Sequence, residues 1–253
     1  MKKVSFILIA IVSMAPFLHA QDTTSMTKII TKPVHHNNIV KVNLLALGLK
    51  TITIQYERVI GRKTTLAVGL RMMPKGNLPF EHNFRSAVKD STTQNQLDNF
   101  KTSNFAIMPE IRFYLSRKGA YHGFYIAPFI SYSHYTASLP YNYTDNGADE
   151  TIPLSGSTNT ISGGLMFGAQ WKIGKTLYLD WWIFGPNYGS SKGSLSGTQS
   201  LSASEQTSLK SSIDGLNVPL VKTTSTVSAN GAILNFNGPW AGIRSGLCIG
   251  FRF

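Results

Sequence analysis

From residue 39 onward, apolar side chains alternate with polar or small ones in short runs. The last run, residues 238–253, places Ala241, Ile243, Leu247, Ile249, Phe251 and Phe253 on one side, and Arg244, Cys248, Arg252 and four glycines on the other. A β-strand turns successive side chains to opposite faces, so such a run predicts a strand with one apolar face. Eight runs of this kind occur, at residues 40–47, 52–57, 66–72, 105–115, 123–135, 161–172, 177–183 and 238–253.

The connections between these predicted strands alternate in length. After a first short connection at 48–51, short turns at 61–63, 116–121 and 174–175 alternate with long loops at 74–103, 136–159 and 186–237. Within the long loops we expect short helices over residues 83–97 and 203–213, and a hairpin extension over residues 218–227. In an antiparallel up-and-down barrel, short turns collect at one rim and most long loops at the other. The pattern therefore predicts an all-β fold, an eight-stranded antiparallel up-and-down transmembrane β-barrel with long extracellular loops.

The N-terminus has the features of an export signal. Lys2 and Lys3 precede an apolar run, Val4–Ala15, and Leu18–Ala20 forms a cleavage site. We therefore expect a signal peptide at residues 1–20, a flexible polar segment at 21–38 and the barrel at 39–253. Export makes nucleic acid an unsuitable partner. The adjacent pair at residues 35–36, both histidine, is interpreted as solvated linker, because neighbouring side chains rarely converge on one metal ion.

Composition narrows the choice between fold classes. The 42% hydrophobic content resembles a soluble protein, and no run of about 20 apolar residues occurs that would indicate a spanning helix. A barrel escapes that test because half of each strand faces its interior. A soluble exported barrel or sandwich would also alternate, but outward aromatic residues near strand ends favour interfacial girdles at a membrane: Tyr56, Phe113, Trp171 and Trp181.

Net charge points to the class of partner. The formal charge of +12 falls to +10 without Lys2 and Lys3, since 22 basic residues then face 12 acidic ones. Outer-membrane lipid and lipopolysaccharide phosphates are the expected counter-charges. The alternative is that scattered lysines merely keep long loops soluble.

The alternating pattern also resembles a known class. The stretch Lys41–Arg71, KVNLLALGLKTITIQYERVIGRKTTLAVGLR, and the closing strand with its terminal aromatic residue resemble small bacterial outer-membrane barrels of the OmpA-transmembrane and OmpW-like kind, including uncharacterised Bacteroidota-type barrel families. This resemblance implies a cell outer-membrane location with both termini periplasmic. It also implies that the barrel assembly machinery reads Phe251 and Phe253 as an assembly signal.

Several charged residues fall on the inward faces of the predicted strands: Glu57, Arg71, Glu110, Arg112, Lys172, Asp180 and Arg244. An eight-stranded barrel has an interior just wide enough for side chains to fill it. Mixed signs in so narrow a space predict a paired network that neutralises itself. A selective pore or a proton path is the alternative interpretation.

One local group resembles an active site. His134 and Thr136 share a face at the end of a predicted strand, with Asp149 and Glu150 beyond, and this is similar to outer-membrane lipid A deacylases. The resemblance implies a hydroxyl nucleophile activated by histidine and oriented by a carboxylate. Thr136 and Ala137 depart from the serine and asparagine of that family. The other interpretation makes His134 an interfacial polar residue.

No phosphate-binding loop, dinucleotide fingerprint, zinc motif or nucleophile elbow occurs in the sequence, so we expect no cofactor and no metal site. Cys248 is interpreted as a small space-filling residue. We therefore expect a non-enzymatic barrel with a structural, adhesive or partner-anchoring role through its long loops, for which an envelope protein is a candidate partner. The alternatives are a small-solute or hydrophobic-compound transporter and a lipid A-modifying enzyme.

Overall fold

The computed structural model describes residues 37–79, 94, 98–215 and 220–253. Three sequence predictions concern parts of the chain that fall outside these residues. They are the signal peptide at 1–20, the flexible segment at 21–38 except for its last two residues, and the helix at 83–97 except for residue 94.

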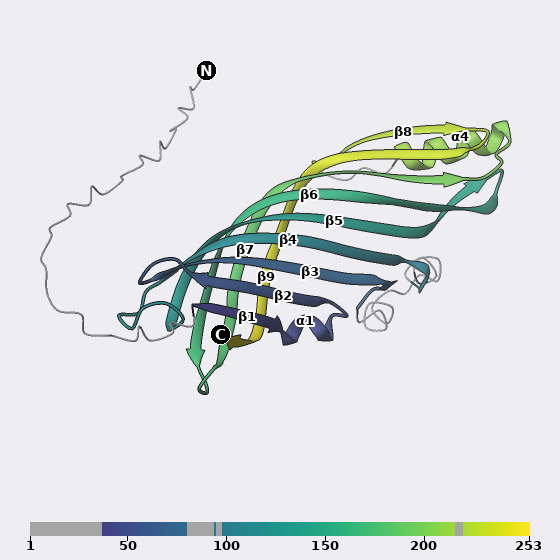
Figure 1. Ribbon diagram of the computed structural model, residues 1–253. Helices are drawn as coiled ribbons and strands as arrows, with labels where there is room; N and C mark the ends of the chain where they lie inside the picture. Colours follow the sequence, from purple (N-terminus) through teal and green to yellow (C-terminus); the bar gives the residue numbers. More distant parts are fainter. Residues whose placement is uncertain (1–36, 80–93, 95–97, 216–219) are drawn as a thin grey trace, which may run out of the picture. The chain divides into compact units, whose positions relative to one another are not determined.

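Strands form most of the described chain: β1 (Asn38–Asn43), β2 (Ile52–Val59), β3 (Thr64–Asn77), β4 (Lys101–Tyr114), β5 (Gly123–Asp145), β6 (Ala148–Lys172), β7 (Leu177–Thr198), β8 (Lys222–Ser228) and β9 (Gly231–Arg252). Consecutive strands from β1 to β7 pair antiparallel, β7 pairs with β9, and β9 pairs with β1, which closes a ring of eight (Figure 1). β8 pairs with the first part of β9 as an addition to the ring. The predicted eight-stranded antiparallel up-and-down barrel is confirmed.

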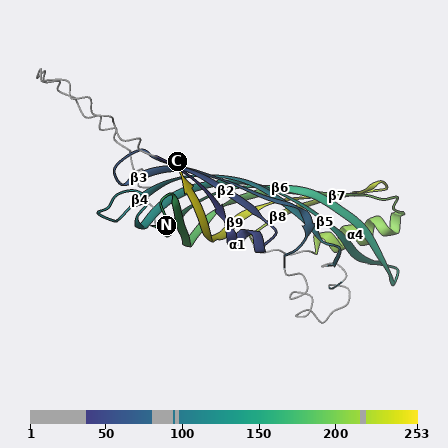
Figure 2. The ribbon, with the colours of Figure 1, turned by 60° about the horizontal axis from the view of Figure 1, so that its bottom comes forward.

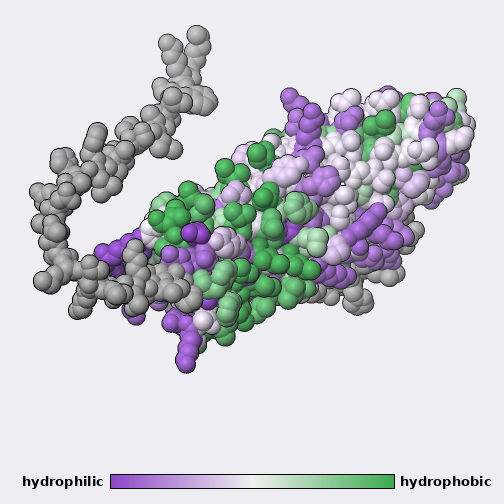
Figure 3. Space-filling model, in the orientation of Figure 1, coloured by the Kyte–Doolittle hydropathy of each residue, from purple (hydrophilic) through white to green (hydrophobic). Residues whose placement is uncertain are grey.

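Side chains alternate between the inside and the outside of the ring. On β4, Ala106, Met108 and Glu110 are buried, whereas Phe105 and Ile107 are exposed. Most large aliphatic residues point outward, whereas the interior holds polar and charged side chains together with packed aromatic ones such as Tyr125 and Trp182. On the face shown in Figure 3, exposed apolar side chains cover the end of the barrel where β1 to β3 lie. The opposite end of the molecule is mostly polar.

The turns at 61–63, 116–121 and 174–175 and the C-terminus lie at one end of the ring, which we call the near rim. The backbone N–H of Ala120 donates to the carbonyl of Arg62 over 2.9 Å, and that of Arg252 donates to Thr176 over 2.9 Å. The N–H of Phe253 donates to the carbonyl of Asn38 over 2.9 Å. These three short connections are therefore grouped at one rim, as predicted, whereas the first short connection, at 48–51, lies at the opposite end of the ring.

The first predicted strand ends earlier than expected. Residues Leu44–Gly48 form a short helix, α1, instead of continuing the strand to residue 47. Asn43 caps this helix, because its Oδ1 accepts a hydrogen bond from the N–H of Ala46 over 3.2 Å. Asparagine is among the preferred N-cap residues, so this local bond ends the extended conformation. Alternation up to Leu47 was misleading here.

Two of the predicted long loops are mostly β-structure. β5 and β6 continue through residues 136–159 and meet at a two-residue turn, in which Asn146 and Gly147 have φ values of 48° and 82°. Asn-Gly with positive φ at both positions is the preferred sequence of a tight hairpin turn. Residues 186–237 likewise contain the second half of β7, a helix, β8 and the start of β9.

A β-bulge changes the facing of one predicted position. The register between β7 and β9 shifts between Trp182 and Gly185. Phe184 is therefore exposed, whereas Ile183, which we expected to face outward, is half-buried. An extra residue on one strand reverses the parity of every residue after it, so alternation alone misassigns the faces beyond the bulge.

Beyond the ends of β1 and β2, the long strands form a second packed region, which we call the distal lobe (residues 138–155, 195–215 and 220–235). Figures 1 and 2 show β5, β6, β7 and β9 continuing to this end, with β8 and the helix α4 (Ala203–Asp214) beside them. Its core contains Tyr143, Ile152, Leu154, Leu201, Leu209, Ile213, Ala232 and Leu234. The predicted helix at 203–213 is confirmed. No helix among the described residues is long and apolar enough to cross a membrane.

Candidate functional site in the barrel interior

Lys41 is fully buried at the centre of the ring, where β1 faces β2 and β7. Its Nζ donates to a carboxylate oxygen of Glu57, to Oδ2 of Asp180 over 2.5 Å and to Oε1 of Gln170 over 3.0 Å. Successive residues of a strand face opposite sides, and the neighbours Val40 and Val42 face away from the interior. The side chain of Lys41 therefore points into the ring. The ammonium group thus links two carboxylates from strands on either side of β1.

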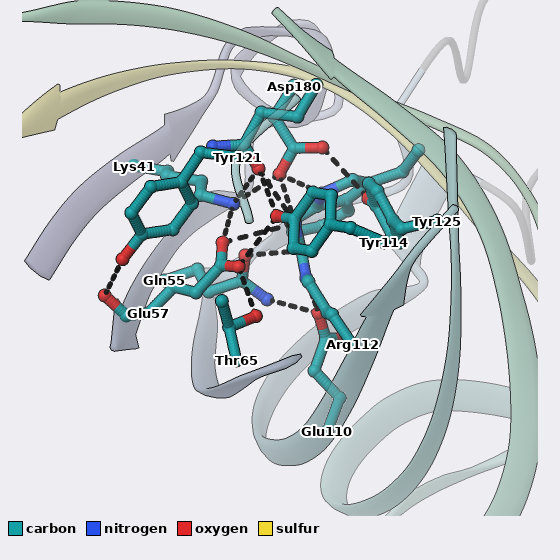
Figure 4. A network of polar contacts seen from close by, with 12 residues as sticks. Lys41, Gln55, Glu57, Thr65, Glu110, Arg112, Tyr114, Tyr121, Tyr125 and Asp180 are labelled. Atoms are coloured by element: carbon teal, nitrogen blue, oxygen red, sulfur yellow. Dashed lines mark hydrogen bonds and ion pairs between the residues drawn. The ribbon is translucent and has the colours of Figure 1, made fainter. Parts of the chain in front are cut away.

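Arg112 forms the second cationic centre. Its Nε donates to Oε1 of Glu110 over 2.5 Å, its Nη1 to Oδ2 of Asp180 over 2.6 Å, and its Nη2 to Oε1 of Gln55 over 2.7 Å. Arg244, from β9, donates through Nη1 to the second oxygen of Glu110. The planar fork of a guanidinium suits such simultaneous contacts, so Arg112 connects residues from β2, β4 and β7 (Figure 4).

Neutral donors complete the coordination of the buried carboxylates. Tyr114 Oη donates to Oε1 of Glu57 over 2.7 Å. Asp180 accepts from Tyr125 Oη over 2.8 Å and from the indole N–H of Trp182 over 3.0 Å. Hydrogen bonds of this kind are what make buried charges tolerable in a low-dielectric interior.

The network is electrically balanced. Three carboxylates and three cationic side chains form the buried ion pairs that span the interior: Glu57, Glu110, Asp180, Lys41, Arg112 and Arg244. Towards the near rim, Tyr121 donates to the carbonyl of Asn37 over 2.7 Å, and Arg252 donates to Tyr178 over 2.9 Å. Side chains therefore fill the cross-section of the ring at two successive levels.

Five of the seven predicted interior residues meet in this network: Glu57, Glu110, Arg112, Asp180 and Arg244. Arg71 also faces inward, but it bonds Asn104 and Tyr135 in a separate layer. The interior assignment of Lys172 was wrong, because the side chain is exposed at the end of β6. Lys41 was missed as a member of the network, although its inward parity with Asn43 in the alternating run was a usable signal.

The three candidate catalytic residues do not come together. His134 Nδ1 is 2.8 Å from Oδ1 of Asn159, and Thr136 Oγ1 is 2.7 Å from Oγ of Ser103. Glu150 lies opposite Tyr143, nine residues along β5 from His134, which is about 30 Å at the usual rise of a strand. His134, Thr136 and Glu150 therefore do not form the arrangement of base, nucleophile and orienting carboxylate that the resemblance implied.

The remaining sequence candidates are single residues. Phe251 and Phe253 are exposed at the end of β9 on its outward face. Cys248 is buried on the inward face, in contact with the core around Tyr178 and Trp182. Within the described parts of the chain, no group of three or more histidine, cysteine, aspartate or glutamate side chains could hold a metal ion.

Comparisons with known proteins give limited guidance. Residues 8–188 match the profile of a family described as "Protein of unknown function (DUF3575)". No curated protein matches the chain. Among solved structures, the chain is similar to the translocator domain of autotransporter NalP from Neisseria meningitidis, with 14% identity over 86% of this chain and 88% of that chain and a TM-score of 0.36. This likeness is too weak to bear on function.

Proposed function

The chain belongs to the DUF3575 family of proteins of unknown function, and from that premise we propose that it is a non-conducting outer-membrane barrel that holds the distal lobe outside the cell. In this proposal the lobe binds an envelope or surface partner, and the barrel is its anchor. The near rim, with both ends of the strand ring, faces the periplasm. Catalysis has no part in the proposal.

The apolar outer surface supports the membrane location. The exposed side chains include aliphatic residues from every part of the ring and the aromatic residues Tyr56, Phe113, Trp171 and Trp181. Monomeric soluble proteins rarely expose contiguous apolar patches of more than a few hundred square ångströms. Closure of the ring also leaves few strand edges unpaired, as a hydrocarbon environment requires.

The filled interior supports a non-conducting barrel, and it yields a direct prediction. We expect the purified full-length protein, reconstituted in planar bilayers, to show no stable ion conductance, because paired side chains occupy the lumen. The measurement is single-channel recording, with a known porin as the positive control in the same bilayer. Reproducible conductance steps that scale with protein concentration would instead favour the pore alternative.

The observation that carries the proposed binding role is the core of the distal lobe. α4 is held by a complete capping box at Ser202 and Glu205, and it packs Leu209 and Ile213 onto the inner face of the extended sheet. A barrel needs none of this structure to close. Rigid elements presented beyond a membrane anchor are typical of a recognition surface, since binding residues concentrate on connections that a scaffold positions.

A shortened chain tests this role. Thr198 and Gly231 lie directly opposite each other in the β7–β9 register, so residues 199–230 can be replaced by a two-residue Asn-Gly turn. We expect this variant to form the barrel, measured by its heat-dependent shift in gel mobility, and to lose partner contact in the envelope. Failure of the barrel to form would show that the lobe serves folding instead.

Photo-crosslinking measures that partner contact. A photoreactive residue at the exposed position Thr207 on α4 is compared with one at the exposed barrel position Leu66. We expect a discrete protein adduct from position 207 only. This adduct should disappear when the wild-type protein, which has the lobe but no photoreactive residue, is present in excess. Identical adduct patterns from both positions, or adducts with lipid alone, would contradict the proposed role.

A further inference from the structure

The barrel wall has an interruption beside α1. β1 pairs with β9 only over residues 248–252 of β9, and β8 pairs with β9 only over residues 231–237. Among the described residues, no strand pairs with this edge of β9 between residues 238 and 247. A cavity of about 430 Å³ lies here, lined by Leu45 and Ala46 of α1, by the inward Arg244 and by the exposed Ile243, among other residues. We call it the seam cavity.

Two more cavities follow towards the distal lobe. A small one of about 160 Å³, the neck, shares Arg71, Met108, Ile243 and Arg244 with the seam cavity. The largest, about 540 Å³, shares Tyr135 and Trp240 with the neck, and we call it the upper cavity. The three cavities thus lie in succession from the interruption in the wall to the base of the lobe, above the ion network.

The chemistry of this path changes along its length. The upper cavity is lined mainly by apolar and aromatic side chains, among them Leu195, Leu234, Phe236 and Trp240. Its volume falls within the range of about 300–1,000 Å³ that is usual for small-molecule sites. Phe236 and Arg244 are eight residues apart on β9, or about 26 Å along the strand. The apolar section therefore suits a long chain better than a compact molecule.

The neck is cationic. Arg244 has two donor atoms, Nε and Nη2, that are buried without a hydrogen-bond partner, although its Nη1 pairs with Glu110. Its guanidinium carbon is 4.1 Å from the ring centroid of Trp182, which holds the group in place. Arg71 bonds only neutral oxygens of Asn104 and Tyr135 in the described structure. Two guanidinium groups thus have capacity for an acceptor that these residues do not supply.

We propose that this path binds a single-chain anionic amphiphile. The anionic head lies in the neck against Arg71 and Arg244, and the acyl chain extends into the upper cavity along Phe236 and Trp240. The seam cavity is the opening through which the molecule enters from the membrane. Entry from lipid depends on the proposed membrane location, whereas the binding site itself does not. A carboxylate and a phosphate head share the recognising chemistry, and the experiment distinguishes them.

Binding is measured on the full chain in detergent micelles with a dibrominated long-chain fatty acid, whose bromines quench nearby tryptophan fluorescence. A Trp171→Phe/Trp181→Phe background removes the two outward indoles that detergent-phase probe would reach. Trp182 and Trp240 remain, and they line the seam and upper cavities. We expect saturable quenching of their fluorescence, and at least about tenfold weaker binding of the methyl ester, because one lost charge contact of 1.4 kcal/mol changes affinity tenfold. A single-chain phosphate amphiphile, used as competitor, reports whether phosphate is preferred to carboxylate.

Three variants and one control localise the site. Arg71→Gln should weaken binding of the acid about tenfold and leave the ester unchanged, whereas Arg62→Gln, at the exposed near-rim turn, should change neither. Thr158→Trp should fill the upper cavity and abolish binding of both. Ala46→Trp should slow association through the seam cavity. Each variant is first shown to be folded by its gel-mobility shift.

Two results would overturn the proposal. One is equal, non-saturating quenching by acid and ester, which is simple partition into micelles. The other is saturable binding that is insensitive to both Arg71→Gln and Thr158→Trp in folded protein. Preference for the phosphate competitor would keep the site and assign it to phosphate-headed lipids.

Discussion

Arg112→Leu is expected to lower the free energy of unfolding of the barrel by about 3–5 kcal/mol, the usual effect of removing one partner from a buried ion pair. Arg112 bonds Glu110 and Asp180 inside the ring and is fully buried. Its loss leaves three buried carboxylates with only two cations. The measurement is equilibrium urea unfolding in lipid vesicles, followed by tryptophan fluorescence.

Two further variants separate charge imbalance from loss of packing. Arg112→Leu combined with Asp180→Asn leaves two buried carboxylates with two cations, so it should recover part of the lost stability. Arg62→Leu makes the same change at an exposed turn and should lie within about 0.5 kcal/mol of the wild type. An Arg112→Leu barrel as stable as the wild type would mean that the network contributes nothing to folding.

Leu209→Asp is expected to detach α4 from the distal lobe while leaving the barrel folded. Leu209 is fully buried in the lobe core, so the change removes a large apolar contact and places a charge without a designated partner there. Loss of the leucine side chain alone costs about 2–5 kcal/mol, and the buried charge adds to that value. Hydrogen exchange should increase across α4 and β8, with β1 to β4 unchanged.

The matched control places the same charge on the opposite face of the helix. Thr207 is exposed on α4, so Thr207→Asp should preserve protection of the lobe. Global loss of protection in Leu209→Asp, including the near rim, would indicate that the lobe and barrel fold as one cooperative unit. Protection unchanged in both variants would mean that α4 does not depend on this core.

The barrel was predictable because its physics is repetitive. Each strand faces a narrow interior on one side, so the alternation of large and small residues that begins at Val40 reappears on every strand. The number of strands, and the side to which each residue points, can therefore be predicted from the local sequence alone. The Asn146-Gly147 turn was also readable, since the dipeptide is a strong hairpin signal, and it should have extended β5 and β6 through the expected loop.

The sequence predictions of strand ends and facing were wrong where a local hydrogen bond, a β-bulge or the end of a strand interrupts the two-residue alternation. Asn43 caps α1 through one side-chain hydrogen bond, although Leu44 and Ala46 continue the alternation. The bulge before Gly185 shifts facing by one residue. Lys172 lies on the inward side of the alternation but is the last residue of β6, at the rim of the ring, so the alternation could not predict its exposure.

The interior site was predictable in kind but only partly in membership. Inward parity and mixed charge identified most of the ion network. Which cation bonds which carboxylate depends on the stagger of strands far apart in sequence, such as β1 and β7, and no local pattern encodes that stagger. The cavities above the network were not foreseen, because they depend on where β1 stops and on the rotamers of Arg71 and Arg244.

The short paired segment between β1 and β9 has a consequence for the order of folding. These strands are the first and last of the ring, and only five residue pairs join them. Bringing them together closes a loop of nearly the whole described chain, which is entropically the most demanding contact in the molecule. Ring closure is therefore the natural final step of folding, preceded by a curved open sheet with two bare edges. Such edges readily add foreign strands, so a chaperone that shields the first and last strands would act at this stage.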